Sequence, residues 1–288
     1  MRTTLYTIIG ICLTLIFLRY SVREIHADKK KIWPISYRLF QGTEAWTLAK
    51  AVQDEDIIKI KNILREKPEL VNLQDSVNGN SLLFISIYDQ HYRAFKTMLE
   101  MGANVNLING FGDKPIIEAC SWDRCDVKFV KELVKYGADI NDSTNYYKDS
   151  PLMCAVSSRN KELVSYLIDN HAVINTSNNR KATILGEALI MDEYDIVLQL
   201  LENGADYKCS VYYCIDNYGK KTIPMRITEA MRSDIFDIGS KEHRQKMAVV
   251  KFLKDRGIDY YKEPIPDYIL KRIKKYYPND WREYIKEY

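Results

Sequence analysis

The sequence repeats itself at an interval of about 33 residues, a spacing typical of stacked repeats. Four segments open the repeat: SLLFIS (81–86), KPIIEA (114–119), SPLMCA (150–155) and TILGEA (183–188). Each is followed by a turn of small residues: GANVN (102–106), GADIN (137–141), HAVIN (171–175) and GADYK (204–208). This regularity predicts a solenoid, in which each unit buries its apolar surface only against its neighbours.

The copy at 150–175 shows what one unit contains. Ser150 and Pro151 form a helix start, because a hydroxyl caps the first turn and proline suits the first helical position. A second helix is predicted over 161–170, with an apolar stripe at helical spacing. The stripe consists of Leu163, Val164, Leu167 and Ile168. The unit is therefore two short helices followed by a turn.

This pattern resembles the ankyrin repeat, whose signature is T-P-L-H-x-A, a second helix, and then G-A-D-x-N. The closest matches are 114–116, 150–152 and 137–141, and weaker copies occupy 46–64 and 227–259. The resemblance covers residues 43–261 and implies an all-α solenoid of about five to six helix-turn-helix repeats. We expect residues 29–42 to be a linker and residues 262–288 to cap the solenoid, since terminal repeats need a polar outer face.

The chain departs from the family pattern between the two helices, where ankyrin repeats carry glycine. Polar residues stand there instead, and either prolong the first helix or adopt a left-handed turn. They are Glu55, Gln90, Asp123, Arg159 and Asp192. His171 replaces a turn glycine. Insertions are expected near 120–125, 208–222 and 232–243, in loops where specificity tends to reside.

The first 28 residues have a different character. Residues 3–18 carry no charge and lie between Arg2 and Arg19. The run is short for a membrane span, but it suits either an uncleaved anchor or a secretory signal. We favour an uncleaved membrane anchor, because the sequence offers only a weak signal-peptidase cleavage site. Five basic residues between 19 and 31 favour a cytoplasmic repeat domain. Short leading segments also export the domain behind them, so the side of the membrane stays open.

Charge and cysteine content narrow the function classes. The 42 basic and 39 acidic residues give a net charge of +3, too small to predict a nucleic-acid partner. The pairs Cys120/Cys125 and Cys209/Cys214 share a C-x4-C spacing. They form loop disulfides if the domain is exported, or pack as small apolar residues if it is not. We favour packing, especially at Cys120 and at Cys154.

No catalytic signature is present. The sequence lacks G-x-S-x-G, G-x-x-x-x-G-K-[ST], H-E-x-x-H and the Rossmann glycines. We therefore expect no enzyme activity, cofactor, metal or small-molecule substrate, and we interpret residues 54–56 as a charged turn. A terminal helix should turn Tyr268, Ile269, Ile273 and Tyr276 inward. The alternative is an enzyme or regulatory subunit with a site in the insertions 208–222 and 232–243. That site would be lined by Asp234, Asp237, His243 and Cys214.

A binding surface is the remaining prediction. The family resemblance implies that turn tips and the exposed side of the first helices contact a protein partner along the concave face. The residues at these places are Phe111, Glu118, Trp122, Tyr146, Tyr147, Ser158, Glu187, Met191, Tyr212 and Tyr213. We expect a membrane-held protein-binding module, similar to bacterial accessory proteins of which some neutralise a toxin. A second alternative is a membrane scaffold that self-associates through its anchor.

Overall fold

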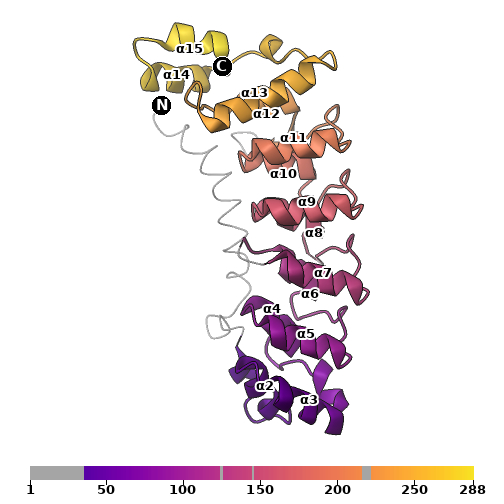
Figure 1. Ribbon diagram of the computed structural model, residues 1–288. Helices are drawn as coiled ribbons and strands as arrows, with labels where there is room; N and C mark the ends of the chain where they lie inside the picture. Colours follow the sequence, from indigo (N-terminus) through magenta and orange to yellow (C-terminus); the bar gives the residue numbers. More distant parts are fainter. Residues whose placement is uncertain (1–35, 124–125, 145, 216–221) are drawn as a thin grey trace. The chain divides into compact units, whose positions relative to one another are not determined.

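A computed structural model describes residues 36–288 except 124–125, 145 and 216–221 (Figure 1). The chain divides into two compact units, which within the described residues are 36–173 and 174–288. The expected anchor at 3–18 and Cys125 lie outside the described residues. Among the helices that are described, none has the length and apolar character needed to cross a membrane.

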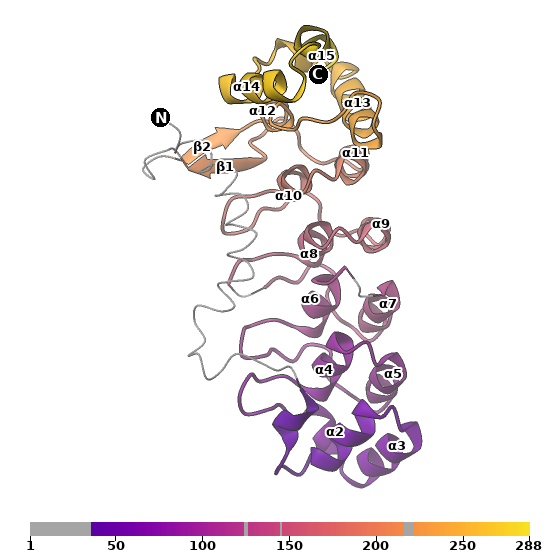
Figure 2. The same ribbon diagram turned by 90° about the vertical axis from the view of Figure 1, so that its left-hand side faces the viewer.

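The unit at 36–173 consists of four helix pairs preceded by a short 3-10 helix. In chain order the elements are η1 (Tyr37–Phe40), α2 (Trp46–Gln53), α3 (Ile57–Glu66), η2 (Pro68–Asn72), α4 (Leu82–Tyr88), α5 (Tyr92–Glu100), α6 (Pro115–Cys120), α7 (Val127–Lys135), α8 (Pro151–Ser157) and α9 (Lys161–Asp169). The first helices of the pairs form one layer and the second helices form another (Figure 2). The predicted helical repeats are confirmed.

Local sequence explains where these helices begin. The Ser81 hydroxyl accepts a hydrogen bond from Phe84 N, and the Ser150 hydroxyl accepts one from Met153 N, so both serines act as N-caps. Pro115 and Pro151 occupy the first helical position. The predicted apolar stripe of α9 is buried throughout. Residues 37–40, which we expected in a linker, form η1 and bury Tyr37 and Phe40.

Left-handed backbone follows the first helix at four of the five predicted positions, as one of our two alternatives stated. The residues between paired helices have φ of 49° at Glu55, 63° at Gln90, 58° at Arg159 and 57° at Asp192. At the repeat turns, His171 has φ of 64° where other copies place glycine. Side chains add further support, since the Glu55 carboxylate accepts hydrogen bonds from Arg93 N at 2.8 Å and Ala94 N at 3.1 Å. The charged segment at 54–56 thus connects neighbouring repeats.

The unit at 174–288 begins with two further helix pairs and ends with two additional helices. Its elements are α10 (Ile184–Ile190), α11 (Tyr194–Glu202), β1 (Tyr212–Ile215), β2 (Thr222–Met225), α12 (Ile227–Met231), α13 (Lys241–Lys254), η3 (Tyr260–Lys262), α14 (Asp267–Tyr276) and α15 (Trp281–Glu287). The insertion predicted at 208–222 forms an antiparallel hairpin, with Tyr212 opposite Met225 and Cys214 opposite Ile223. An all-α expectation did not include this hairpin.

The hairpin is attached to the start of α10. The Thr183 hydroxyl donates to Val211 O at 3.0 Å and accepts from Gly186 N at 3.0 Å. Thr183 N also donates to Val211 O at 2.9 Å. A Cβ on Gly186 would lie 2.0 Å from Val211 O, so only glycine lets the hairpin approach this helix.

Two helices close the chain's described residues, where we expected a single terminal helix. Their apolar sides form a cluster of buried residues: Ile269, Ile273, Tyr284 and Tyr288. The inward orientation predicted for Ile269 and Ile273 is confirmed. The one predicted for Tyr276 is wrong, since its side chain is 55% exposed. The reason is that α14 ends at Tyr276, and Tyr277 turns back to stack on Tyr284 at 4.3 Å instead.

Candidate protein-binding surface

Buried polar side chains shape the tips of the loops that precede the first helices. Asp75 accepts hydrogen bonds from Val77 N and Asn80 N, both at 2.9 Å. In the next repeat, the Asn109 Oδ1 accepts from Phe111 N and Asp113 N at 3.0 and 2.9 Å. These side chains replace backbone partners and fix the loop conformation, as Asx turns do.

Adjacent tips are also bonded to each other. Gly110 N donates to Asn78 O at 2.7 Å, and the Gln74 amide donates to Ile108 O at 2.7 Å. The Asn109 amide donates to Asn80 Oδ1 at 3.2 Å. A Cβ on Gly110 would lie 2.7 Å from Asn78 O, so the two loops touch along their main chains. These contacts hold the tips at 75–80 and 109–113 as one preorganised surface.

Apolar side chains project from the tips of the unit at 36–173. Val77 is 50% exposed, Phe111 52% and Tyr146 63%. The half-buried Tyr147 supports Tyr146 through an edge-to-face ring contact at 4.6 Å. We call Val77, Phe111 and Tyr146 the tip residues. The sequence prediction missed Val77 because it relied on aromatic residues, whereas the place of Val77 in the repeat period already indicated a tip.

The predicted first-helix residues of this unit are less accessible. Glu118 is buried, and the Trp122 indole donates to its carboxylate at 2.6 Å. Trp122 also makes an edge contact with Tyr88 at 5.7 Å. The Ser158 hydroxyl donates to Cys120 O and Ala155 O, both at 3.1 Å. The exposure we expected of Glu118 is therefore wrong, because the Trp122 indole covers its carboxylate. Contact with a partner stays a prediction.

Among the predicted residues in the unit at 174–288, those of the first helix are again buried and one loop-side residue is exposed. Glu187 is buried in the middle of α10 and Met191 is buried at its C-cap, contrary to the exposure expected. Tyr212 is half-buried in β1. Tyr213 is exposed, and Lys181 Nζ lies 5.4 Å from the centre of its ring. Of this set, Tyr213 is the side chain that a partner would reach first.

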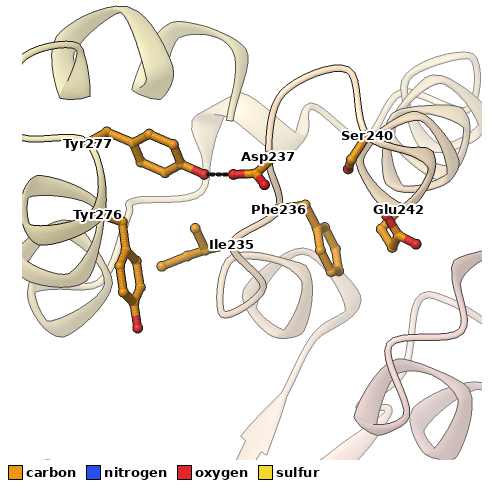
Figure 3. A pocket seen from close by; sticks show the side chains of 7 residues that line it. All are labelled: Ile235, Phe236, Asp237, Ser240, Glu242, Tyr276 and Tyr277. Carbon is orange, nitrogen blue, oxygen red and sulfur yellow. Dashed lines mark hydrogen bonds between the residues drawn. The ribbon is translucent and has the colours of Figure 1, made fainter.

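The same unit contains a pocket of about 440 Å³ beside the insertion at 232–243 (Figure 3). Its lining residues are Ile235, Phe236, Asp237, Ser240, Glu242, Tyr276 and Tyr277. Of the four residues that our enzyme alternative placed together, only Asp237 lines it. His243 instead accepts a hydrogen bond from Gly239 N at 3.3 Å through Nδ1, and Cys214 lies in β1.

Buried charged side chains contact the loop at 232–243, part of which lines this pocket. Lys246 is buried, donates to Asp234 O at 2.9 Å and lies 4.2 Å from the centre of the Tyr288 ring. Burial lowers the pKa of Lys246 and raises the pKa of Asp234, whose carboxylate accepts a hydrogen bond from the Tyr194 hydroxyl. Arg232, also buried, donates to Tyr260 O at 3.2 Å. These contacts are structural rather than open to a substrate.

The remaining polar candidates have structural partners. Cys120 and Cys154 are fully buried, as packing predicts. Cys209 is exposed, and its thiol contacts Asp206 O at 3.6 Å. His91 pairs with the Tyr37 hydroxyl at 2.9 Å. Within the described ranges, no three His, Cys, Asp or Glu side chains gather as metal ligands would.

Comparison with known proteins agrees with this architecture. A family model of ankyrin repeats matches residues 48–144 and 126–210. The ankyrin repeat protein FPV034 of fowlpox virus (strain NVSL) is 32% identical over 159 residues, covering 55% of this chain and 36% of that protein. FPV031 of the same virus is 25% identical over 115 residues, covering 39% of this chain and 33% of that protein. The chain spans about a third of the length of these relatives.

A bacterial relative is similar over a comparable stretch. The phosphocholine transferase AnkX of Legionella pneumophila (subsp. pneumophila, strain Philadelphia 1) is 24% identical over 159 residues, which is 51% of this chain but 16% of that protein. The family model covers more than half of the chain, and the first five described helix pairs begin 33 to 36 residues apart. The chain therefore belongs to the ankyrin-repeat family, and its repeats constitute a protein–protein interaction module.

Proposed function

We propose that the unit at 36–173 binds a protein partner through its tip residues. The observation that carries the proposal is that Val77 and Phe111 project, half-exposed, from adjacent loops that are hydrogen-bonded to each other. Tyr146 extends this apolar set to the next tip. A surface that is rigid before binding loses less conformational entropy when a partner docks.

The side chains suit an interface rather than solvent. Fully burying a phenylalanine side chain contributes roughly 1.5–3 kcal/mol, so covering the exposed half of Phe111 contributes about half of that. Aromatic residues such as Phe111 and Tyr146 are also frequent among interface hot spots. The tyrosine hydroxyl keeps a polar partner at the rim. We therefore expect Phe111 and Tyr146 to account for much of the binding energy, with Val77 contributing less.

The test combines capture and a double substitution. The tagged chain is used to capture a partner from gently solubilised native membranes, and the partner is identified by mass spectrometry. Changing Phe111→Ala together with Tyr146→Ala should weaken that complex at least about tenfold. Thermal stability should stay nearly constant, because exposed side chains are removed.

Ile58→Ala is the matched control, since Ile58 is 75% exposed on α3 in the other helix layer. This control should leave the complex unchanged. Equal weakening by Ile58→Ala, or no weakening by the double variant, would refute tip binding. Tyr146→Ala with Tyr147→Ala tests the same surface at one tip, and unfolding of that variant would show that the two rings are structural.

We also propose that residues 1–28 hold the chain at a membrane as an uncleaved anchor. The support is the uncharged run at 3–18 between Arg2 and Arg19. Deleting residues 1–28 should release the chain from floated membranes, and the intact chain should keep its N-terminal sequence. Protease protection of the repeats in sealed vesicles would decide on which side they lie.

A narrower proposal concerns the biological role. We propose that the chain neutralises a toxin, because chains of this type resemble accessory proteins of which some do so. Its function is then binding and not catalysis. AnkX is named as a transferase, but the similar stretch is 16% of its length, and repeats support only a binding role here. If the captured partner is toxic on its own, co-expression of this chain should restore growth. The Phe111→Ala, Tyr146→Ala variant should fail to do so.

A further inference from the structure

The pocket at the insertion 232–243 has an unusual lining for a surface hollow. Two carboxylates, Asp237 and Glu242, share it with the aromatic rings of Phe236, Tyr276 and Tyr277 (Figure 3). Its lining residues include no lysine, arginine or histidine. The chemistry of the walls is therefore anionic and aromatic, which is the combination that attracts organic cations.

The walls are fixed by contacts that leave the pocket open. The Tyr277 hydroxyl donates to Asp237 Oδ1, and its ring stacks on Tyr284 at 4.3 Å. The Tyr284 hydroxyl in turn donates to Phe236 O at 2.6 Å. Burial, together with the neighbouring Asp237, raises the pKa of Tyr277, so the phenol keeps its proton and remains a donor. The loop and the end of α14 thus form one preorganised wall.

Hydrogen-bonding capacity remains on the anionic side. Asp237 Oδ2 and the Glu242 carboxylate have no hydrogen bond or ion pair with the described residues, and both side chains are exposed. Tyr276 is 55% exposed on the opposite side of the pocket from Glu242, and Arg272 lies 5.9 Å from its ring centre (Figure 3). An anionic ligand would be repelled here, and a neutral apolar ligand would desolvate two carboxylates without compensation.

We propose that this pocket binds an arginine side chain of a protein partner. A guanidinium group is planar, so it can donate two parallel hydrogen bonds to a carboxylate while it stacks on an aromatic face. The pocket belongs to the unit at 174–288 and the tip residues belong to the unit at 36–173. This proposal therefore does not depend on the proposed role of the tip residues.

The experiment titrates the full chain, kept soluble in mild detergent, with the peptide acetyl-Gly-Arg-Gly-amide. Binding is followed by isothermal titration and by NMR shifts of the amides at 235–242. We expect saturable binding, and a peptide with citrulline in place of arginine should bind at least about tenfold more weakly, because it is neutral. A lysine peptide should bind more weakly than the arginine peptide, since it lacks the planar fork.

Two variants separate the pocket from general charge effects. Asp237→Asn with Glu242→Gln keeps the shape of the pocket and should weaken the arginine peptide at least about tenfold. Glu283→Gln removes an exposed carboxylate on α15 outside the pocket and should change nothing. Circular dichroism checks that each variant is folded.

Three results would overturn the proposal. They are no binding at about 10 mM peptide, equal binding of the citrulline peptide, and undiminished binding by the Asp237→Asn, Glu242→Gln variant. Failure here is distinguishable from failure of the proposed function, because the peptide assay does not involve the tips. The Phe111→Ala, Tyr146→Ala variant should bind the arginine peptide normally.

Discussion

His171 and Gly137 occupy the same position in successive turns, and both have a left-handed backbone conformation. Gly137 has φ of 94° and His171 has φ of 64°. A residue with a Cβ in this region costs about 1–2 kcal/mol relative to glycine. The exposed His171 ring makes no hydrogen bond to the described residues that would offset this cost. The histidine is thus strained without a compensating contact inside the chain.

We predict that His171→Gly raises the free energy of unfolding by roughly 0.5–1 kcal/mol, the strain relieved less the entropy that glycine adds to the unfolded chain. The reciprocal change Gly137→His should lower it by a similar amount, because nothing lies within 4 Å of a Cβ at Gly137 and only strain is added. Chemical unfolding measures both. A destabilising His171→Gly would mean that the ring makes a stabilising contact.

The hairpin β1–β2 shows how one residue determines the placement of an element. In the first segment of each repeat, Gly186 stands where other copies have Phe84, Ile117 and Met153. Val211 O comes so close to α10 that any side chain at this position would collide with main chain. Thr183 then fixes the contact from both its main chain and its hydroxyl.

We predict that Gly186→Ala destabilises the fold by about 1–3 kcal/mol, the cost of leaving buried main-chain groups unpaired. An alanine in a helix ordinarily gains up to about 1 kcal/mol over glycine, so a loss has diagnostic value. Hydrogen exchange at Val211 and Met225 should accelerate as the hairpin moves away.

Gly204→Ala supplies the comparison for that substitution. Its Cβ would meet nothing within 4 Å, so it reports left-handed strain less the entropy that alanine removes from the unfolded chain, about 1 kcal/mol. Should Gly186→Ala stabilise the protein, or cost no more than Gly204→Ala, the close approach of the hairpin would be wrong.

Periodicity predicted the repeats well, because each pair of helices carries its own caps, apolar stripe and turn. Ser150, Pro151 and the α9 stripe needed no tertiary information. The hairpin could not be predicted the same way, because its strands are four residues long and Pro224 argues against a strand. Gly186 among large residues was the available signal of a close backbone approach.

The candidate site also has a part that the repeat period predicts and a part that depends on tertiary packing. The tips were located from the repeat period, which is why Phe111 and Tyr146 are exposed where expected. The exposure of first-helix residues depends on which side chain covers which, and a single sequence does not contain that information. Glu118 is covered by Trp122, four residues later on the chain. The pocket combines a loop and α14 from distant parts of the sequence, so spacing alone could not reveal it.

At the scale of the whole chain, 42 basic and 39 acidic residues nearly cancel, so the net field contributes little to stability. The response to pH must come from individual desolvated groups. Lys246 and Asp234 are such groups, and burial moves their pKa values in opposite directions. The Asp234 carboxyl group governs how stability responds at lower pH. Because its pKa is raised in the folded state, the folded chain holds a proton that the unfolded chain releases.

Lys246 controls the alkaline side. Its pKa is lowered by burial from the ordinary 10.5, while nearby Asp234 opposes and Arg232 reinforces the shift. Between the folded and unfolded pKa values the unfolded chain binds one more proton, so the free energy of unfolding rises with pH in that window. The slope is at most about 1.4 kcal/mol per pH unit. Below the folded pKa, both states bind the proton and the slope vanishes.

We predict that Lys246→Met reduces this slope, measured by chemical unfolding at about pH 8 and about pH 9.5. Lys251→Met removes an exposed lysine from the same helix and should leave the slope as it is. The difference between the two variants isolates the buried Lys246 amine, which lies beside Asp234 O and the Tyr288 ring. Parallel slopes in the wild type and both variants would show that Lys246 reaches solvent when charged, and that the loop at 232–243 opens.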